Sequence, residues 1–152
     1  MERQRRFRRH VTAVVIAGLT LAACTSDEDD GFTLARDACR LAYMDAGQLS
    51  GSAAREHARE KTIPRLEKSA DKAAQAALRD GNWQSLATAM SDAAEHFSVG
   101  VELGELRATG MSGGYSISEY TDRDADLQAR FDELSGRNPA AIIAAECRKT
   151  KG

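Results

Sequence analysis

The sequence predicts an all-α domain, an Ala-rich bundle of about four to five helices. Apolar residues recur three and four positions apart through most of the chain, which is the period of one helix face. β-Branched residues are few, and Pro64 and Pro139, the two prolines, both stand near predicted helix starts. Residues 24–152 also contain 23 alanines, which favour helix and let neighbouring helices approach closely.

The first predicted helix begins at Thr33, a candidate N-cap, and ends at Gly47 or Gly51. Helical spacing places five residues on its apolar stripe: Phe32, Ala35, Cys39, Ala42 and Ala46.

A second helical region is predicted over residues 52–79. Pro64 must kink or restart this helix, because proline lacks the amide hydrogen and clashes with the preceding turn. Thr62 is a candidate cap for the restarted helix, with Pro64 in its first turn. Asp80 and Gly81 end the region. Its expected apolar face comprises Ile63, Leu66, Ala70, Ala73, Ala77 and Leu78.

Asn82 is a candidate cap for the third helical region. Gly100 and Gly104 weaken its later part, so the region is either one helix to about Thr109 or breaks near Gly100; the long helix is favoured. The apolar positions with helical spacing are Trp83, Leu86, Ala87, Met90, Ala94, Phe97, Val101, Gly104 and Ala108.

A glycine-rich loop is predicted over residues 110–120, before two further helices. Thr121 is the candidate cap of the first, which ends at Gly136. Asn138 and Pro139 start the second. Their apolar stripes are Leu127, Phe131 and Leu134, and then Ala140, Ile143, Ala144 and Cys147.

Charge is distributed unevenly along the chain. Residues 1–23 carry five arginines and one acid, which leaves 16 basic and 22 acidic residues over 24–152, a net charge of −6. A nucleic-acid binder needs a basic excess in its folded part, so nucleic acid is excluded as a partner.

The first 23 residues have the organisation of a secretory signal peptide. A basic segment, residues 1–10, precedes an uncharged, mostly apolar run of 13 residues, 11–23. A bilayer-spanning helix needs about 20 apolar residues, so this run is too short to remain in the membrane as a span. Gln4 before the arginine pair departs from the twin-arginine export motif, and the general secretory route is favoured.

The apolar run ends in Leu21-Ala22-Ala23-Cys24, which resembles the lipobox of bacterial lipoproteins at every position. The resemblance implies that the Cys24 thiol carries diacylglycerol and that signal peptidase II cuts between Ala23 and Cys24. Two acyl chains hold a protein on a membrane stably, which predicts a mature chain anchored to the extracytoplasmic side of the cell membrane. Conventional cleavage that leaves Cys24 unmodified is the alternative.

Residues 25–31 are polar, acidic and without helical period, which predicts a solvated tether. The expected organisation is therefore a signal peptide over 1–23, a lipidated cysteine and tether over 24–31, and a helical domain over 32–152.

With Cys24 lipidated, Cys39 and Cys147 are left as the one possible disulfide pair in a compartment that permits disulfides. Both lie on apolar stripes, and their bridge would tie the first helix to the last. Two separate buried thiols are the alternative.

No catalytic or metal site is predicted, and no cofactor is expected. His57 and His96 follow Ala54 and Ala93 at three residues' distance, so neither completes the Glu-x-x-His motif of di-iron bundles. Both histidines are interpreted as parts of solvated helix faces. Because no nucleophile, base and orienting group can be assembled, the chain is not expected to be an enzyme.

The layout resembles the small, uncharacterised lipoproteins of actinobacteria. The resemblance rests on Leu21-Ala22-Ala23-Cys24, the acidic segment, the Ala-rich helices, and the cysteines in Ala38-Cys39-Arg40 and Glu146-Cys147-Arg148. It covers the chain loosely, only the lipobox is specific, and no activity carries over from such a group.

The expected function is a non-catalytic interaction or structural module of the cell envelope. Tyr115 and Tyr120 are the candidate contacts with an unidentified envelope protein, because exposed aromatic rings beside mobile glycines are useful anchors. For these two rings the alternative is that they pack back onto the bundle. The alternative is a small ligand bound in a cleft between helices. A pocket lined by Trp83, Phe97 or Phe131 would favour the ligand, although Trp83 is most simply part of the core.

Overall fold

The computed structural model describes residues 25–42 and 51–151 and places nearly all of them in helices. Short π-helical and 3-10 turns lie between the α-helices: η1 (Ala58–Thr62), η2 (Gly81–Trp83) and η3 (Gly110–Gly113). The α-helices of this part are α1 (Thr25–Ala42), α2 (Gly51–His57), α3 (Ile63–Arg79), α4 (Gln84–Thr109), α5 (Ile117–Gly136) and α6 (Pro139–Lys149). The predicted all-α class is confirmed, and the described ranges contain no strand.

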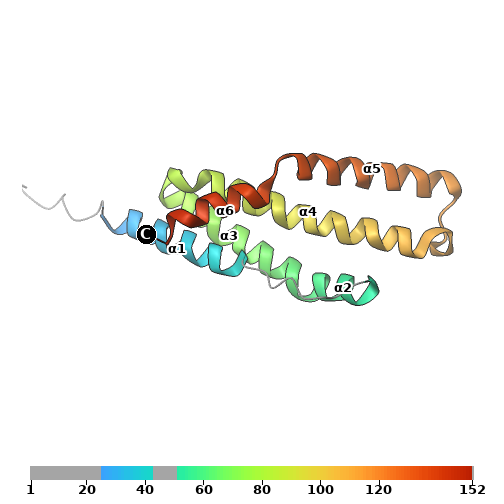
Figure 1. Cartoon of the computed structure of the whole chain (residues 1–152), viewed down its shortest axis with the longest axis horizontal. Coiled ribbons are helices and arrows are strands. Elements are labelled where there is room, and N and C mark those ends of the chain that lie inside the picture. Colours follow the sequence, from blue (N-terminus) through green and yellow to red (C-terminus); the bar gives the residue numbers. More distant parts are fainter. Residues whose placement is uncertain (1–24, 43–50, 152) are drawn as a thin grey trace, which may run out of the picture.

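Helix α4, with 26 residues, is the longest helix of the described chain, and it runs along the length of the bundle. Helices α3 and α6 pack against it, α1 packs on α3, and α5 runs back along α4 as an antiparallel arm (Figure 1). Helix α5 makes its main contacts with α4 alone, whereas α3 is held between α1 and α4. The molecule therefore has a packed end around α1, α3 and α6 and a two-helix arm made by α4 and α5.

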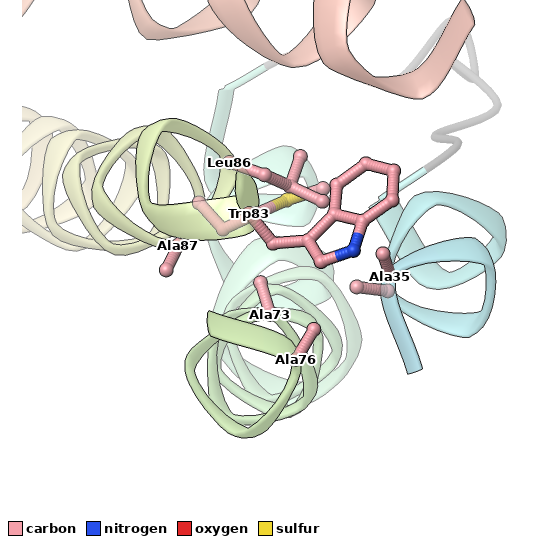
Figure 2. Close-up of a cluster of buried hydrophobic side chains, with 8 residues drawn as sticks. Ala35, Ala73, Ala76, Trp83, Leu86 and Ala87 are labelled. Atoms are coloured by element: carbon pink, nitrogen blue, oxygen red, sulfur yellow. The ribbon is translucent and has the colours of Figure 1, made fainter. Parts of the chain in front are cut away.

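The core lies where α1, α3 and the start of α4 meet, and Figure 2 shows the indole ring of Trp83 over small alanine side chains there. Because these side chains are small, α1 and α3 approach closely, and the buried hydroxyl of Ser69 donates a hydrogen bond of 2.8 Å to the carbonyl of Ala38. The buried cluster comprises Ala35, Ala38, Ala73, Ala76, Trp83, Leu86, Ala87 and Met90.

Leu78 was expected on the apolar face of this region, and that expectation is wrong. Its side chain is 87% exposed. Buried Ala76 precedes it by two residues, a rotation of about 200° around the helix, so Leu78 points away from the core.

The prediction of a non-helical tether over residues 25–31 is also wrong in part, because α1 begins at Thr25 and includes these acidic residues. Positions 27–30 lie in its first two turns, where the positive end of the helix dipole favours negative charge. Gly31 is buried against the end of α3, and a β-carbon there would lie 3.2 Å from the Cβ of Asp80. Tertiary contact thus supports a helical segment that lacks an apolar period. The predicted end of the first helix at Gly47 lies outside the described residues.

Pro64 interrupts the regular α-helix of the second region as expected, but the chain stays helical through residues 51–79 and does not restart. It stands in the first turn of α3, and the π-helical turn η1 directly precedes α3. Proline cannot continue the regular α-helical hydrogen bonding, and a π turn absorbs the mismatch. Thr62 does not act as the predicted cap, because the chain enters α3 in helical conformation and its hydroxyl makes no cap hydrogen bond.

Asp80, rather than Asn82, caps the turn between α3 and α4. Asp80 has an extended backbone, and its carboxylate accepts a hydrogen bond of 3.0 Å from the amide of Asn82. The favoured long helix is confirmed, because α4 runs unbroken to Thr109 through both Gly100 and Gly104.

The predicted loop over residues 110–120 ends four residues earlier than expected. Ser116, not Thr121, caps α5: its hydroxyl accepts from the amide of Glu119, whose carboxylate accepts from the amide of Ser116. This capping box is written in the sequence as Ser-Ile-Ser-Glu. Tyr120 therefore lies in a helix.

The predicted boundaries of the last two helices are confirmed at Gly136 and Pro139. Asn138 between them has a φ of +51°, in the left-handed region that asparagine tolerates better than most residues, and its side chain makes no cap hydrogen bond.

Candidate functional site

The expected disulfide is confirmed between Cys39 of α1 and Cys147 of α6, whose Cα atoms lie 5.6 Å apart. It joins residues 108 positions apart, at the first and last helices. Both cysteines are half-buried and pack against the core cluster. The predicted lipidation site, Cys24, and the predicted signal peptide lie outside the described residues.

A cleft of about 980 Å³ lies beside this disulfide. It is lined from α1, α3, α4 and α6 by Arg36, Cys39, Arg40, Ala42, Leu66, Ala93, Phe97, Ala140, Ile143, Ala144, Cys147, Arg148, Thr150 and Lys151. The four residues predicted as the apolar face of the last helix all line it, and Ala140 and Ala144 are exposed there. The apolar stripe of α6 therefore faces this cleft as well as the core.

Among the described residues, the charged ones that line the cleft are all cationic: Arg36 and Arg40 on α1, Arg148 on α6, and Lys151 after it. Arg36, Arg148 and Lys151 make no ion pair within the described residues, and Arg40 reaches Asp37 only at 4.0 Å. The Nε atom of Arg36 is buried and has no hydrogen-bond partner there. In a domain with an acidic net charge, this cleft is a local cationic region.

A second groove, of about 440 Å³, lies farther along α4 between α2 with η1 and α5. Its lining is mainly apolar and comprises Ala54, Arg55, Ala58, His96, Phe97, Gly100, Val101, Gly104 and Phe131. Phe97 lines both the cleft and the groove, so the two hollows adjoin at this ring.

The two histidines have different surroundings. His57 is exposed at the end of α2, whereas His96 on α4 hydrogen-bonds the hydroxyl of Ser135 at 2.9 Å. The ring of His96 also lies against that of Phe131, with 4.2 Å between centroids. His96 thus helps to seat α5 on α4. The described residues contain no group of three or more His, Cys, Asp or Glu side chains arranged to hold a metal ion.

Tyr115 and Tyr120 lie at the far end of the α4–α5 arm, and both are half-buried. The guanidinium of Arg123 lies over the ring of Tyr115, 5.7 Å from its centroid, and donates to its hydroxyl at 3.3 Å. Glu102 accepts a hydrogen bond from Arg123 and raises the pKa of this arginine. Tyr115 is therefore held by its neighbours, and the predicted partner contact of the two rings stays a prediction.

Ion pairs follow the length of the α4–α5 arm. Three of the ion pairs in the described chain join α4 to α5: Arg107–Asp124, Glu102–Arg123 and Glu95–Arg130. A fourth, Asp92–Arg137, joins α4 to the residue that directly follows α5. Hydrogen bonding from Arg107 lowers the pKa of Asp124, and hydrogen bonds from Arg130 and Arg137 lower that of Glu133. Charge thus contributes to holding the arm closed.

Comparison with known proteins gives this chain no relatives: no family model, curated protein or solved structure matches it. Within residues 25–42 and 51–151, no helix is both long and apolar enough to cross a membrane.

Sequence reasoning anticipated Phe97 and Phe131 as lining residues of a ligand pocket but missed the cationic residues around the cleft. Arg40 and Arg148 each directly follow a cysteine, so the predicted disulfide itself brings them to the same part of the molecule. Arg36 and Lys151 give no such signal, because their approach depends on the packing of α1 against the end of the chain.

Proposed function

We propose that this chain is a membrane-anchored, extracytoplasmic binding protein that holds a small apolar ligand without catalysis. The cleft beside the Cys39–Cys147 disulfide carries the proposal. Ligand sites in proteins are typically hollows of about 300–1,000 Å³ with mainly apolar walls and a few polar groups. The cleft has this character, and Phe97 lies between it and a second apolar groove.

The ligand-binding function has more support than the partner-contact function assigned to Tyr115 and Tyr120. Phe97 and Phe131 line mainly apolar hollows, whereas Tyr115 lines a hollow of about 470 Å³ whose other lining residues are charged, and it is already engaged by Arg123. Trp83 belongs to the buried core and does not line either hollow.

Ligand binding is tested by filling the cleft. Ala144 is exposed at the cleft wall, so Ala144→Trp inserts a large ring there. Native mass spectrometry of the full chain with N-phenyl-1-naphthylamine, a neutral apolar probe, should detect one bound probe molecule. Ala144→Trp should weaken its binding by about tenfold or more, the effect of losing a main contact surface.

The matched control is Ala74→Trp, at an exposed position of α3 outside both hollows, which should bind the probe like the unchanged chain. Equal binding by both variants and the unchanged chain would contradict the assignment of the cleft.

The membrane anchor is a separate part of the proposal and rests on the basic segment, the apolar run and the lipobox that ends at Cys24. Mass spectrometry of the mature chain should find a diacylglyceryl-modified Cys24 at its N-terminus, and Cys24→Ser should abolish the modification. An unmodified N-terminus, or a chain that retains residues 1–23, would contradict the anchor.

A further inference from the structure

We propose that the ligand is a single-chain fatty acid, with its carboxylate at the cationic residues beside the disulfide and its acyl chain running past Phe97 toward Phe131. This inference rests on the proposed ligand-binding function and adds the chemical class and the direction of the ligand.

The head of the ligand is identified by charge. Arg36, Arg40, Arg148 and Lys151 line the cleft, and no acidic side chain does so within the described residues. This arrangement is specific to the cleft, since residues 24–152 as a whole carry more acids than bases. A lone anionic group would complement it.

The geometry of the arginines favours a carboxylate. A guanidinium offers parallel donors that match the two oxygens of a carboxylate. The buried Nε atom of Arg36 has no acceptor in the described chain, and Arg148 of α6 lines the same cleft without an ion-pair partner there. A carboxylate between α1 and α6 would supply the acceptor that Arg36 lacks.

The tail is identified by the apolar surface that continues from the cleft. Ala93 and Phe97 follow one face of α4 within the cleft, and Phe97, Gly100 and Val101 continue it in the groove. The polar side chains in the groove lining are Arg55 and His96, and His96 is already hydrogen-bonded to Ser135. An acyl chain would therefore meet carbon along most of its length.

The groove is small, about 440 Å³, which favours one acyl chain over two, and both of its walls approach the backbone of α4 closely. A β-carbon on Gly100 would lie 3.2 Å from the ring of Phe131, and one on Gly104 would lie 3.2 Å from the Cδ atom of Arg55. The groove is thus bounded by α5 on one side and by α2 on the other, with the glycines of α4 between them.

The test uses the full chain in phosphatidylcholine nanodiscs and a palmitate analogue with a photoreactive diazirine at the end of its tail. Irradiation should give saturable cross-links to residues 96–104 of α4 and to the peptide that contains Phe131. Unlabelled palmitate should compete about tenfold or more better than 1-hexadecanol, because only palmitate forms charge-assisted hydrogen bonds with the arginines. Competition by shorter fatty acids should weaken by about fourfold for each methylene removed.

The double variant Arg36→Gln with Arg148→Gln should weaken labelling by about tenfold or more. The matched control, Lys61→Gln with Lys68→Gln, removes the same charge at exposed positions outside both hollows and should leave labelling unchanged.

Each contrary outcome is distinct. If 1-hexadecanol competes as well as palmitate and the Arg36 and Arg148 changes have no effect, the anionic head is wrong, while an apolar ligand in the cleft stands. If the groove is not labelled and native mass spectrometry finds the chain as a dimer, a second copy occupies the groove and the fatty acid is wrong. If neither hollow is labelled and N-phenyl-1-naphthylamine also fails to bind, both the fatty acid and the proposed function are overturned.

Discussion

The ring of Phe131 on α5 lies directly against the backbone of α4 at Gly100, where a β-carbon would come within 3.2 Å of its Cε2 atom. The glycine leaves room for the ring, and the same ring contacts His96 one turn earlier on α4. This contact seats the middle of α5 and forms one wall of the groove.

Alanine at the two glycines of α4 should have unequal effects on stability. Gly104→Ala should raise the free energy of unfolding by about 0.5–1 kcal/mol, since alanine favours helix and the facing Cδ of Arg55 belongs to a flexible side chain. Gly100→Ala should raise the free energy of unfolding by less, because the ring of Phe131 must shift to make room for the methyl group. Urea unfolding of both variants measures the difference. An equal gain at both positions would show that the ring moves away without cost.

Removal of the disulfide should destabilise the domain strongly. The bridge closes a loop of 108 residues, and the replacement of Cys39 and Cys147 by alanine should lower the free energy of unfolding by about 2–4 kcal/mol. Thermal unfolding with and without reductant provides the measurement. Reductant should lower the melting temperature of the unchanged chain and have no effect on the double variant. An unchanged melting temperature after complete reduction would show that the bridge adds no stability.

Acid should loosen α5 before it unfolds the core. Hydrogen bonds from arginines lower the pKa values of Asp124 and Glu133 below their ordinary values of 3.8 and 4.5. A carboxyl whose pKa is lower in the folded chain stabilises it above the ordinary pKa, and that contribution is lost as the pH falls through the folded value. Hydrogen-exchange protection of α5 should therefore fall as the pH drops below about 4.5, while that of α3 persists.

High salt at neutral pH provides an independent check on the arm. At about 1 M salt the screening length falls to about 3 Å, so exposed ion pairs weaken while apolar burial does not. Asp124→Asn should reduce both the acid and the salt responses of α5. Equal loss of protection in α3 and α5 would show that the arm and the core open together.

Leucine substitutions at two neighbouring alanines of α3, one buried and one exposed, should have different effects on stability. Ala73 is fully buried between α1 and α4, and Ala73→Leu should lower the free energy of unfolding by about 1–3 kcal/mol through overpacking. Ala74→Leu, at the adjacent exposed position, should change it by no more than about 0.5 kcal/mol. Chemical unfolding of the two variants gives the comparison. A well-tolerated Ala73→Leu would mean that α1 can move away from α3.

Several features were predictable because local chemistry decides them. Proline disturbs the regular hydrogen bonding of a helix, as Pro64 does at the start of α3, and the glycine and proline at residues 136 and 139 delimit the last two helices. The start of α5 was equally local, and it was misplaced because the capping box at Ser116 and Glu119 was overlooked in favour of Thr121.

Other features could not be read from the chain, because an apolar stripe does not say what covers it. The stripe of α6 satisfied every criterion for a core face, yet Ala140 and Ala144 are exposed at the cleft. The acidic segment after Cys24 lacked a helical period, yet it is helical because its buried Gly31 meets the end of α3.

The sequence by itself determined the helical class and the helix boundaries at Gly136 and Pro139, since spacing and backbone chemistry act locally, and it left Cys39 and Cys147 as the pair to expect with Cys24 lipidated. Only the tertiary structure decided that Cys39 and Cys147 pair, and that Arg36 and Arg148, 112 residues apart, line one cleft with no acid among its described lining residues. The physical reason is that side chains distant in sequence meet only through the packing of α1 and α6, which no local pattern specifies.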